Sequence, residues 1–378
     1  MTNRSESESK RARKWKSFSV KTMLIFITVF ACWLGWYIPR VQRQKEAVEW
    51  VESIGGSLQA KAFYDFEIMD PGTFAYKRNA TSPIHQWLVN SLGIDFFHSV
   101  HHVLLNVEPS IDDPSKLGGF PRLRMVQIGR TNAQDLSSFA SLGEIEAIDI
   151  SGSNISSLRG VENCRRLRYL SVVGPVASVE PLRELRQLRR LMIFGYSSNQ
   201  LADLTPLENS TDLNMLEVYG SDVSDLSPLS SLDSLQKLNI GSTQVKDLSP
   251  LVALKNLNSL DLRGLVLDEW GPLSKLTSLK ELRLNMTNFD DLSLLQEMDQ
   301  LVSLSLPGFE PNRVFDLSAI AGLTKLESLD LSNSLVENAD VLPRLPALTK
   351  LIMRRNDSVP EEVLESIKLN RPSLRVYQ

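Results

Sequence analysis

The chain has 378 residues, of which 42% are hydrophobic and 23% charged, and its formal net charge is −4 at pH 7. This composition is that of a folded protein and excludes a disordered one. Nucleic-acid-binding proteins usually carry an excess of positive charge, and this chain has a small net negative charge, so we expect no nucleic-acid partner. With two cysteines, Cys32 and Cys164, the chain has no disulfide framework.

The N-terminus has the pattern of a basic tail followed by a membrane helix. Residues 1–22 contain seven Lys or Arg and two Glu, and residues 23–38 (MLIFITVFACWLGWYI) contain no charge. A helix over this segment is roughly 24 Å long, whereas the hydrocarbon core of a bilayer is about 30 Å thick. Residues 20–22 can supply the missing length, because the long side chain of Lys21 can reach the headgroups from inside the core. Aromatic residues suited to the interface stand at its far end: Trp33, Trp36 and Tyr37. We predict one transmembrane helix at 23–38, with residues 1–22 in the cytoplasm by the positive-inside rule and the remaining chain outside it.

Three other interpretations of the apolar segment stay open. A cleaved signal peptide needs small residues at the cleavage site, whereas this segment ends in Gly35-Trp36-Tyr37-Ile38-Pro39. A lipid attached at Cys32 would follow the bulky Phe30 and would lie inside the apolar run rather than at its end. A buried helix of a soluble protein is disfavoured because the segment follows a basic tail and is apolar on all sides.

Residues 39–99 are predicted to connect the membrane helix to the remaining chain and to cap it. Apolar residues spaced by three or four over 41–54 predict a helix, which Gly55-Gly56 would end. Residues 57–85 predict short strands and loops. Residues 84–97 (IHQWLVNSLGIDFF) predict an amphipathic helix that covers the first coil of the following array. Its inward side chains would be Trp87, Leu88 and Leu92.

From residue 100 to residue 378 the pattern LxxLxL recurs, mostly at intervals of 22 residues. Its registered copies begin at Leu123, Ile145, Leu167, Leu188, Leu213, Leu235, Leu257, Leu279, Leu301, Leu326 and Leu348. An entering strand is expected at Val100 and a closing one at Leu374–Tyr377. So many copies of one period predict a solenoid, in which stacked copies share a continuous core.

Each copy predicts a strand, a turn and a short helical segment. Positions 1, 4 and 6 are apolar and face inward, since alternate residues of a strand point to opposite faces. A Ser or Thr at position 9 can bond backbone groups where the chain leaves the strand. The Asp and Pro of the recurring DLSPL sequence suit the start and the first turn of a 3₁₀ or helical segment.

The consensus, as in LQKLNIGSTQVKDLSPLVAL at 235–254, resembles the 22-residue leucine-rich repeats of internalin-like bacterial proteins. The resemblance covers about two-thirds of the chain. The basic tail, the single membrane helix and the connector also resemble membrane-anchored leucine-rich repeat proteins of bacteria. The resemblance implies an α/β solenoid of horseshoe shape, with a parallel concave β-sheet and short 3₁₀ or helical convex segments. It also implies protein binding as the usual role, without naming a partner.

The repeat accounts for the residues that otherwise suggest chemistry. Cys164 occupies a slot that holds leucine in other copies, so we predict a core residue. His98, His101 and His102 have a spacing that zinc favours, but the predicted strand would turn His101 and His102 to opposite faces. The chain contains no phosphate-binding loop, no catalytic-serine motif and no zinc-protease motif. We expect no cofactor, no metal and no enzymatic activity.

Copies three to five carry outward side chains that the repeat does not require. Positions 3, 5 and 7 point to the concave face, and in most copies they are small or polar. In these copies they are Tyr169, Val173, Arg190, Met192, Phe194, Met215, Glu217 and Tyr219. Aromatic residues, Met and Arg are enriched at interface cores, so we predict that this patch binds a protein or peptide. An extra-long copy adds residues near Tyr196–Leu201, and packing of Tyr196 back onto the sheet is an alternative role for the patch.

Two classes of function remain open for the whole chain. One is recognition of an extracytoplasmic protein or peptide through the concave face. The other is a structural envelope scaffold, in which the array forms a homo-oligomer without a separate ligand. A second group of basic residues near the C-terminus is predicted to form a solvated cap on the last repeat. It consists of Lys350, Arg354, Arg355, Arg371 and Arg375.

Overall fold

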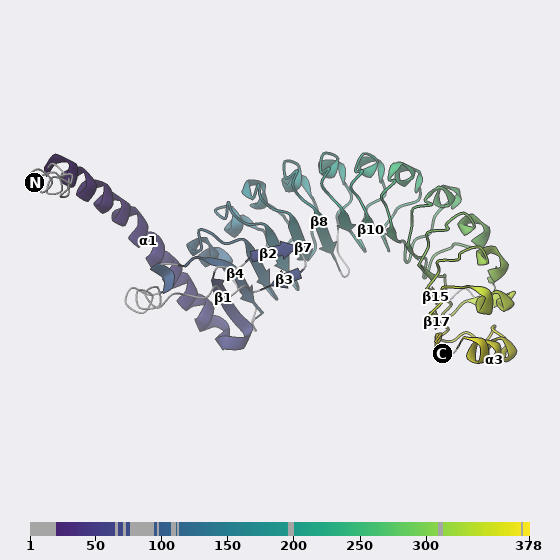
Figure 1. Cartoon of the computed structure of the whole chain (residues 1–378). Coiled ribbons are helices and arrows are strands. Elements are labelled where there is room, and N and C mark those ends of the chain that lie inside the picture. The colour runs from purple at the N-terminus through teal and green to yellow at the C-terminus, as the bar shows by residue number, and fades with distance from the viewer. Residues whose placement is uncertain are drawn as a thin grey trace, which may run out of the picture.

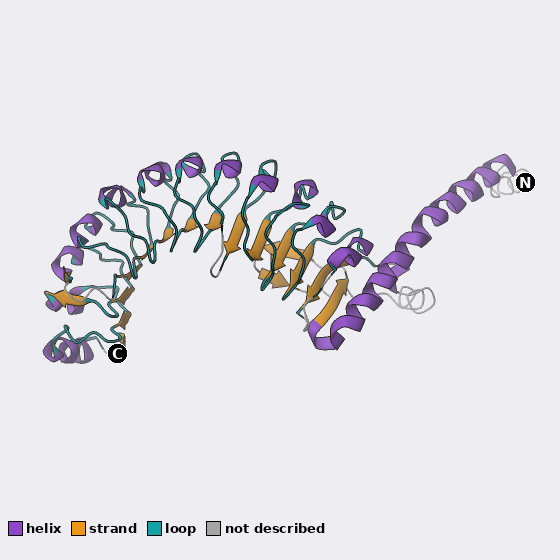
Figure 2. Cartoon of the chain, turned by 180° about the vertical axis from the view of Figure 1, so that it is seen from behind, coloured by secondary structure: helices purple, strands orange, loops and turns teal. Residues whose placement is uncertain are grey.

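The protein is a curved array of repeats with a long helix at its N-terminal end (Figure 1). This computed structural model describes residues 20–64, 67–70, 73–75, 94–96, 98–106, 111, 113–195, 200–308, 313–371 and 373–378. Strands line the inner side of the arch and short 3₁₀ helices line its outer side (Figure 2). The predicted α/β solenoid with a concave parallel sheet is confirmed.

In the described part of the chain, the concave sheet has 14 strands, of which β1 is antiparallel to its neighbour and the others are parallel. In spatial order they are β1 (Ala60–Tyr64), β4 (Val100–Leu105), β5 (Met125–Ile128), β6 (Ala147–Ile150), β7 (Tyr169–Val173), β8 (Arg190–Phe194), β9 (Met215–Glu217), β10 (Lys237–Asn239), β11 (Ser259–Asp261), β12 (Glu281–Arg283), β13 (Ser303–Ser305), β15 (Ser328–Asp330), β17 (Lys350–Ile352) and β18 (Arg375–Tyr377). The entering and closing strands expected from the sequence are β4 and β18. Two small pairs stand apart: β2 (Glu67–Asp70) with β3 (Thr73–Ala75), and β14 (Val314–Asp316) with β16 (Leu335–Glu337).

The convex side consists of short 3₁₀ helices and ends in one α-helix, α3 (Glu361–Asn370). The 3₁₀ helices are η3 (Pro114–Gly119), η4 (Ser137–Phe139), η5 (Val161–Asn163), η6 (Glu180–Leu182), η7 (Thr205–Leu207), η8 (Ser227–Leu229), η9 (Ser249–Ala253), η10 (Gly271–Lys275), η11 (Leu292–Leu295), η12 (Leu317–Ile320) and η13 (Ala339–Arg344). A 3₁₀ helix is short because its hydrogen bonds are strained, which suits a repeat that must turn back within a few residues.

Leucine columns hold the array together. Leu238, Leu260 and Leu282 are paired in register across β10, β11 and β12, and each is buried. The same positions of the other copies are buried as well, so one apolar core runs along the whole array. A single copy would leave its leucines in water, and neighbouring copies therefore stabilise one another.

The polar residues of the repeat bond the backbone as predicted. Asp225 Oδ1 accepts a hydrogen bond of 2.8 Å from the backbone N–H of Ser227, where η8 begins. Thr243 Oγ1 donates to the carbonyl of Ile240 at 2.7 Å, where the chain leaves β10. Equivalent bonds recur in other copies, and they satisfy backbone groups that would otherwise be buried without a partner.

The N-terminal helix α1 (Val20–Gln59) is one continuous element that includes Pro39. The predicted stop at Gly55-Gly56 is wrong, because the helix continues to Gln59 and leads directly into β1. Its apolar part is long enough and apolar enough to cross a membrane, and none of that part is buried by the array. The predicted basic tail lies outside the described residues, apart from its last three positions.

The second half of α1 covers the first coil of the array together with β1. Ala47 and Val51 are buried there. Gln44, which is 4% exposed, connects three segments: its Nε2 donates to Asp95 Oδ1 at 3.0 Å and to the carbonyl of His98 at 2.9 Å, and its Oε1 accepts from the Val100 N–H at 3.2 Å. The amphipathic helix predicted at 84–97 lies mostly outside the described residues, which place the 3₁₀ helix η2 (Ile94–Phe96) at its end.

Candidate binding surface on the concave sheet

Strands β7, β8 and β9 bring the predicted patch together. Parallel register places Tyr169 beside Arg190 and Arg190 beside Met215. In the next column Met192 stands beside Glu217. The strands line the inner side of the arch (Figure 2). These five side chains are partly buried and alternate with the fully buried core residues of their strands, so they lie on the concave face, where they have no apolar core to fill.

Tyr169 is fixed at one end of this patch. Its hydroxyl donates to the sulfur of Met192 across the strand pair at 3.8 Å. Burial raises the pKa of the Tyr169 phenol above its usual value, and the nearby Asp149 carboxylate adds to the rise, while Arg190 opposes it. The phenol is therefore a neutral donor at physiological pH. Such a ring offers a partner both apolar area and a hydrogen bond.

Phe194 extends the patch to the end of β8, where it is paired with Val173 of β7. Both side chains are partly buried. The inserted segment at 196–199 lies outside the described residues, so the alternative that Tyr196 packs onto the sheet remains untested. Val173 and Phe194 supply apolar surface at the edge of the patch where β7 and β8 end.

Tyr219 is separated from the other aromatic residues by the turn that follows β9. Gly220 has a φ of +70°, which redirects the chain. The Tyr219 ring is 38% exposed and lies near the Arg263 guanidinium, 5.7 Å from its carbon to the ring centroid. A Cβ at Gly241 would stand 3.0 Å from Tyr219 Cδ2, so the absence of a side chain at Gly241 makes room for this ring. The predicted patch therefore divides, with Tyr219 joining a neighbouring charged group.

That charged group is centred on Asp261 of β11, which is 5% exposed. Arg263 Nε donates to both carboxylate oxygens at 2.9 Å, and Arg283 of β12 reaches Oδ2 at 3.4 Å. Burial raises the pKa of the Glu217 carboxyl above its usual range, and repulsion from Asp261 adds to the rise. Sequence reasoning missed this group, although opposite charges at position 5 of adjacent copies are a signal for cross-strand pairing.

A shallow hollow of about 140 Å³ joins the two parts of the surface. Its lining comes from β9 to β12 and consists of Met215, Glu217, Lys237, Leu238, Asn239, Ser259, Asp261, Glu281 and Arg283. Apolar and aromatic side chains on one side and paired charges on the other match the core and rim of a protein interface. We call the whole set, from Tyr169 to Arg283 on β7–β12, the concave patch.

Two other groups singled out in the sequence have structural roles. Cys164 is buried, its Sγ donates to the Phe139 carbonyl at 3.6 Å, and burial raises the pKa of its thiol to about 12. Arg371 donates to backbone carbonyls of the last copies, among them Pro346 and Leu348 at 2.9 Å each. Among the basic residues near the C-terminus, Arg371 therefore covers backbone carbonyls of the last copies, which is the role of a cap.

The described part of the chain contains no group of three or more His, Cys, Asp or Glu residues arranged to hold a metal ion.

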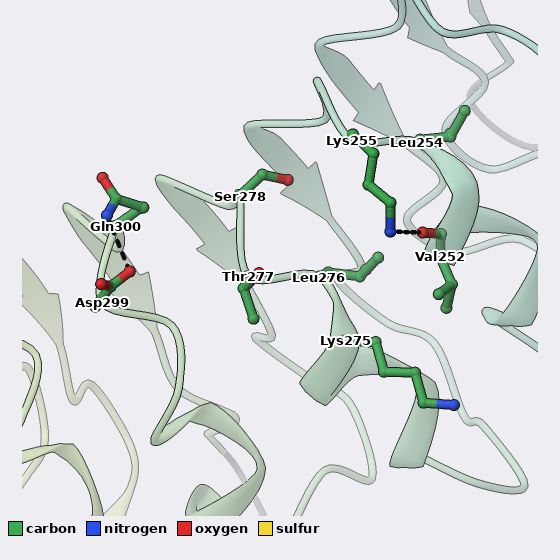
Figure 3. A pocket seen from close by; sticks show the side chains of 9 residues that line it. All are labelled: Val252, Leu254, Lys255, Lys275, Leu276, Thr277, Ser278, Asp299 and Gln300. Carbon is green, nitrogen blue, oxygen red and sulfur yellow. Dashed lines mark hydrogen bonds between the residues drawn. The ribbon is translucent and has the colours of Figure 1, made fainter.

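A hollow of about 350 Å³ lies on the turns between η9 and β13 (Figure 3). Two of its polar side chains bond within the lining: Lys255 Nζ donates to the Val252 carbonyl at 2.8 Å, and Gln300 Nε2 donates to Asp299 Oδ1 at 2.9 Å. This hollow is a shallow depression between the turns of successive copies, and we assign it no ligand.

Comparisons with known proteins agree with this architecture. No protein-family model and no curated protein matches the chain. Among solved structures, an internalin (InlF) from Listeria monocytogenes superposes with a TM-score of 0.57 at 21% identity, over 78% of this chain and 93% of the internalin. A leucine-rich repeat protein from Leptospira interrogans superposes with a TM-score of 0.50 at 16% identity, over 73% of this chain and 83% of that one. At these identities the likeness concerns the fold, and together with the repeat and the sheet it shows that the chain has the leucine-rich repeat fold.

Proposed function

We propose that the protein is anchored in a membrane by α1 and binds an extracytoplasmic protein or peptide through the concave patch. It acts in this proposal as a binding protein and not as an enzyme. The observation that carries the proposal is the group of Tyr169, Met192, Phe194 and Met215, which lie in register on adjacent strands and alternate with the buried core residues of those strands. The leucine-rich repeat fold supports protein binding in general.

The chemistry of the patch favours a protein over a small molecule. Small ligands occupy deep, enclosed, mostly apolar pockets, whereas the concave hollow is shallow and its walls are largely charged. A protein surface gains affinity from a few apolar and aromatic anchors surrounded by a polar rim. Here the β7–β8 side chains supply the anchors, and the Asp261 group with Tyr219 supplies the rim.

The anchor rests on the exposed apolar part of α1. Its apolar side chains from Met23 to Phe30 are more than half exposed, which is costly in water and favourable in lipid. The aromatic pairs Phe30–Trp33 and Trp33–Tyr37 stack along this part of the helix, with ring centroids 5.7 and 4.9 Å apart. The positive charge of residues 1–22 supports an orientation in which the array lies outside the cytoplasm.

The triple variant Tyr169→Ala, Phe194→Ala and Tyr219→Ala tests the binding role. Each truncation removes an aromatic anchor or rim contact without opening the leucine core. We expect partner affinity to fall by about a hundred-fold or more, on the scale of interface hot spots, while the thermal unfolding midpoint stays close to that of the wild type. The measurement is affinity capture of envelope proteins by the full chain in detergent, followed by titration of the captured partner.

The matched control is Val266→Ala, Val314→Ala and Leu335→Ala, which truncates three exposed apolar side chains outside the concave sheet. This control should bind as the wild type does. Equal binding by the concave variant and the wild type would rule out the patch. A mass that doubles with concentration in the wild type but not in the concave variant would instead support the self-associating scaffold.

A further inference from the structure

A cavity of about 670 Å³ separates α1 from the first copies of the array. On the helix side it is lined by Trp36, Tyr37 and Arg40, which stand where the apolar segment ends. On the array side it is lined by the segments that precede β5, β6 and β7, including Arg122. The cavity therefore opens at the level where a membrane helix would emerge from the hydrocarbon core.

Two guanidinium groups of this lining carry unbalanced charge. Arg40 lies over the ring of Trp36, with its guanidinium carbon 3.5 Å from the ring centroid. Arg122 is exposed at the array side of the same cavity. Among the residues that the structure describes, neither arginine forms an ion pair with a carboxylate. Both groups are free to receive an anion.

The carboxylates of the lining are already engaged. Glu146 accepts from Arg124 Nε at 2.7 Å, and Glu144 is paired with Arg166. Asp95 accepts the hydrogen bond from Gln44 that holds α1 to the array. Four arginines and three carboxylates line the cavity, and after the pairing of Arg124 and Arg166 with glutamates the two charges of Arg40 and Arg122 exceed the single charge of Asp95.

The positive character continues along the same edge of the array. Arg124, Glu146, Arg168 and Arg189 occupy the same position in successive copies. Backbone hydrogen bonds of 2.7 to 2.8 Å connect each of them to the next. Glu146 contacts Arg124 at 2.6 Å and Arg168 at 3.8 Å, and Arg189 adds a further positive charge, so the edge that adjoins the cavity attracts anions along several copies.

We propose that this cavity binds the phosphate group of an anionic membrane lipid. The proposal rests on the membrane anchor proposed above. In that setting Trp36 and Tyr37 lie at the interface, and Arg40, one helical turn beyond Trp36, lies among the headgroups. The planar fork of an arginine matches two phosphate oxygens, and the second arginine approaches from the array. A bound lipid thereby fixes the angle between α1 and the array.

The test is native mass spectrometry of the full chain in detergent, with added phosphatidylglycerol or phosphatidylcholine. The wild type should retain phosphatidylglycerol in preference to phosphatidylcholine. The double variant Arg40→Gln and Arg122→Gln should bind phosphatidylglycerol roughly ten-fold or more weakly. The matched control, Arg354→Gln and Arg355→Gln at two exposed arginines near the other end of the array, should bind as the wild type does.

A second arm separates the lipid from free phosphate. Inorganic phosphate in ten-fold excess over the lipid should leave phosphatidylglycerol bound, because the acyl chains remain in the micelle beside α1. Displacement by phosphate alone would overturn the lipid assignment in favour of a soluble phosphate compound. Equal retention of phosphatidylglycerol by the double variant and the wild type would overturn the site.

Alkaline carbonate extraction of cell membranes distinguishes failure of this site from failure of the anchor. Wild type and double variant should both stay in the membrane pellet, since the substitutions leave the apolar segment unchanged. Release of the wild type into the supernatant would contradict the anchor and with it the lipid site. Retention of both proteins, with unchanged lipid binding in the variant, would contradict the lipid site alone.

Discussion

His102 shows how a polar residue is accommodated in the concave sheet. The side chain is buried in β4, with Nε2 3.2 Å from Gln127 Oε1 in β5. Desolvation lowers the pKa of the imidazole from 6.5 to about 4, against a smaller opposite effect of the hydrogen bond to Gln127. The folded protein therefore holds a neutral imidazole at a pH where the unfolded chain binds a proton.

This difference predicts a pH dependence of stability. Between pH 6.5 and 4 the unfolded state binds more protons than the folded state, so the free energy of unfolding should fall as the pH falls through this window. The loss from this residue is at most about 3 kcal/mol. Urea denaturation at pH 7 and pH 4.5 should show a smaller loss in His102→Gln than in the wild type. His98→Gln is the control, and an equal loss in all three proteins would contradict the assignment.

Residue roles were predictable where they depend on neighbours within one copy. The capping aspartates, the position-9 hydroxyls and the core role of Cys164 all follow from the repeat. The orientation of Tyr219 did not follow, because it depends on a left-handed backbone at position 8. That position has φ of +70° at Gly220 but also +59° at Met286 and +53° at Arg355. Glycine is the usual sequence signal for a left-handed backbone, and several copies have another residue at position 8, so the turn could not be predicted from the sequence.

At the scale of elements, α1 and η3 pack at unusually close range. A Cβ at Gly119 would stand 2.7 Å from the Ala47 Cβ and 2.9 Å from the Arg43 carbonyl oxygen. Both are rigid helix atoms that cannot move aside as a long side chain can. Gly119 therefore permits the contact by which α1 covers the first coil.

Gly119→Leu should separate α1 from the array without unfolding the other copies, because each copy contacts its neighbours alone. Hydrogen exchange of backbone amides at 44–51 and in β4 should become at least ten-fold faster, while exchange in β10 to β13 stays unchanged. Gly143→Ala is the control, since a Cβ there meets no atom within 4 Å. Unchanged exchange at 44–51 in Gly119→Leu would show that the contact does not hold the helix.

The element order of the array was predictable, and the N-terminal connection was predictable in part. Strong periodicity determines which residues face the core, and register follows from equal copy length. Helix ends depend on weaker local signals, and Pro39 and Gly55-Gly56 did not end α1. A proline removes one backbone hydrogen bond, and α1 continues through Pro39 all the same. Beyond Pro39 the array holds the helix through Gln44, Ala47 and Val51.

At the scale of the whole molecule, the arch sets the direction of the binding surface. Strands lie side by side on the inner face of the arch and the 3₁₀ helices lie on its outer face (Figure 1). Because the sheet is concave, the residues of β7 to β12 that do not face the core share one curved surface. The sequence predicted the aromatic and Met part of the concave patch. It did not predict the Asp261 group, because ion pairing depends on how side chains bend between adjacent strands.

Site-specific photocrosslinking tests the central claim most directly. A benzoylphenylalanine replaces Met192 on the concave sheet or Ser230 on the convex side of the full-length protein in its native membrane. We predict a covalent adduct of one defined mass from position 192 and none from position 230, and loss of the adduct when Tyr169, Phe194 and Tyr219 are changed to Ala. Equal adducts from both positions, or an adduct from position 230 alone, would contradict binding through the concave patch.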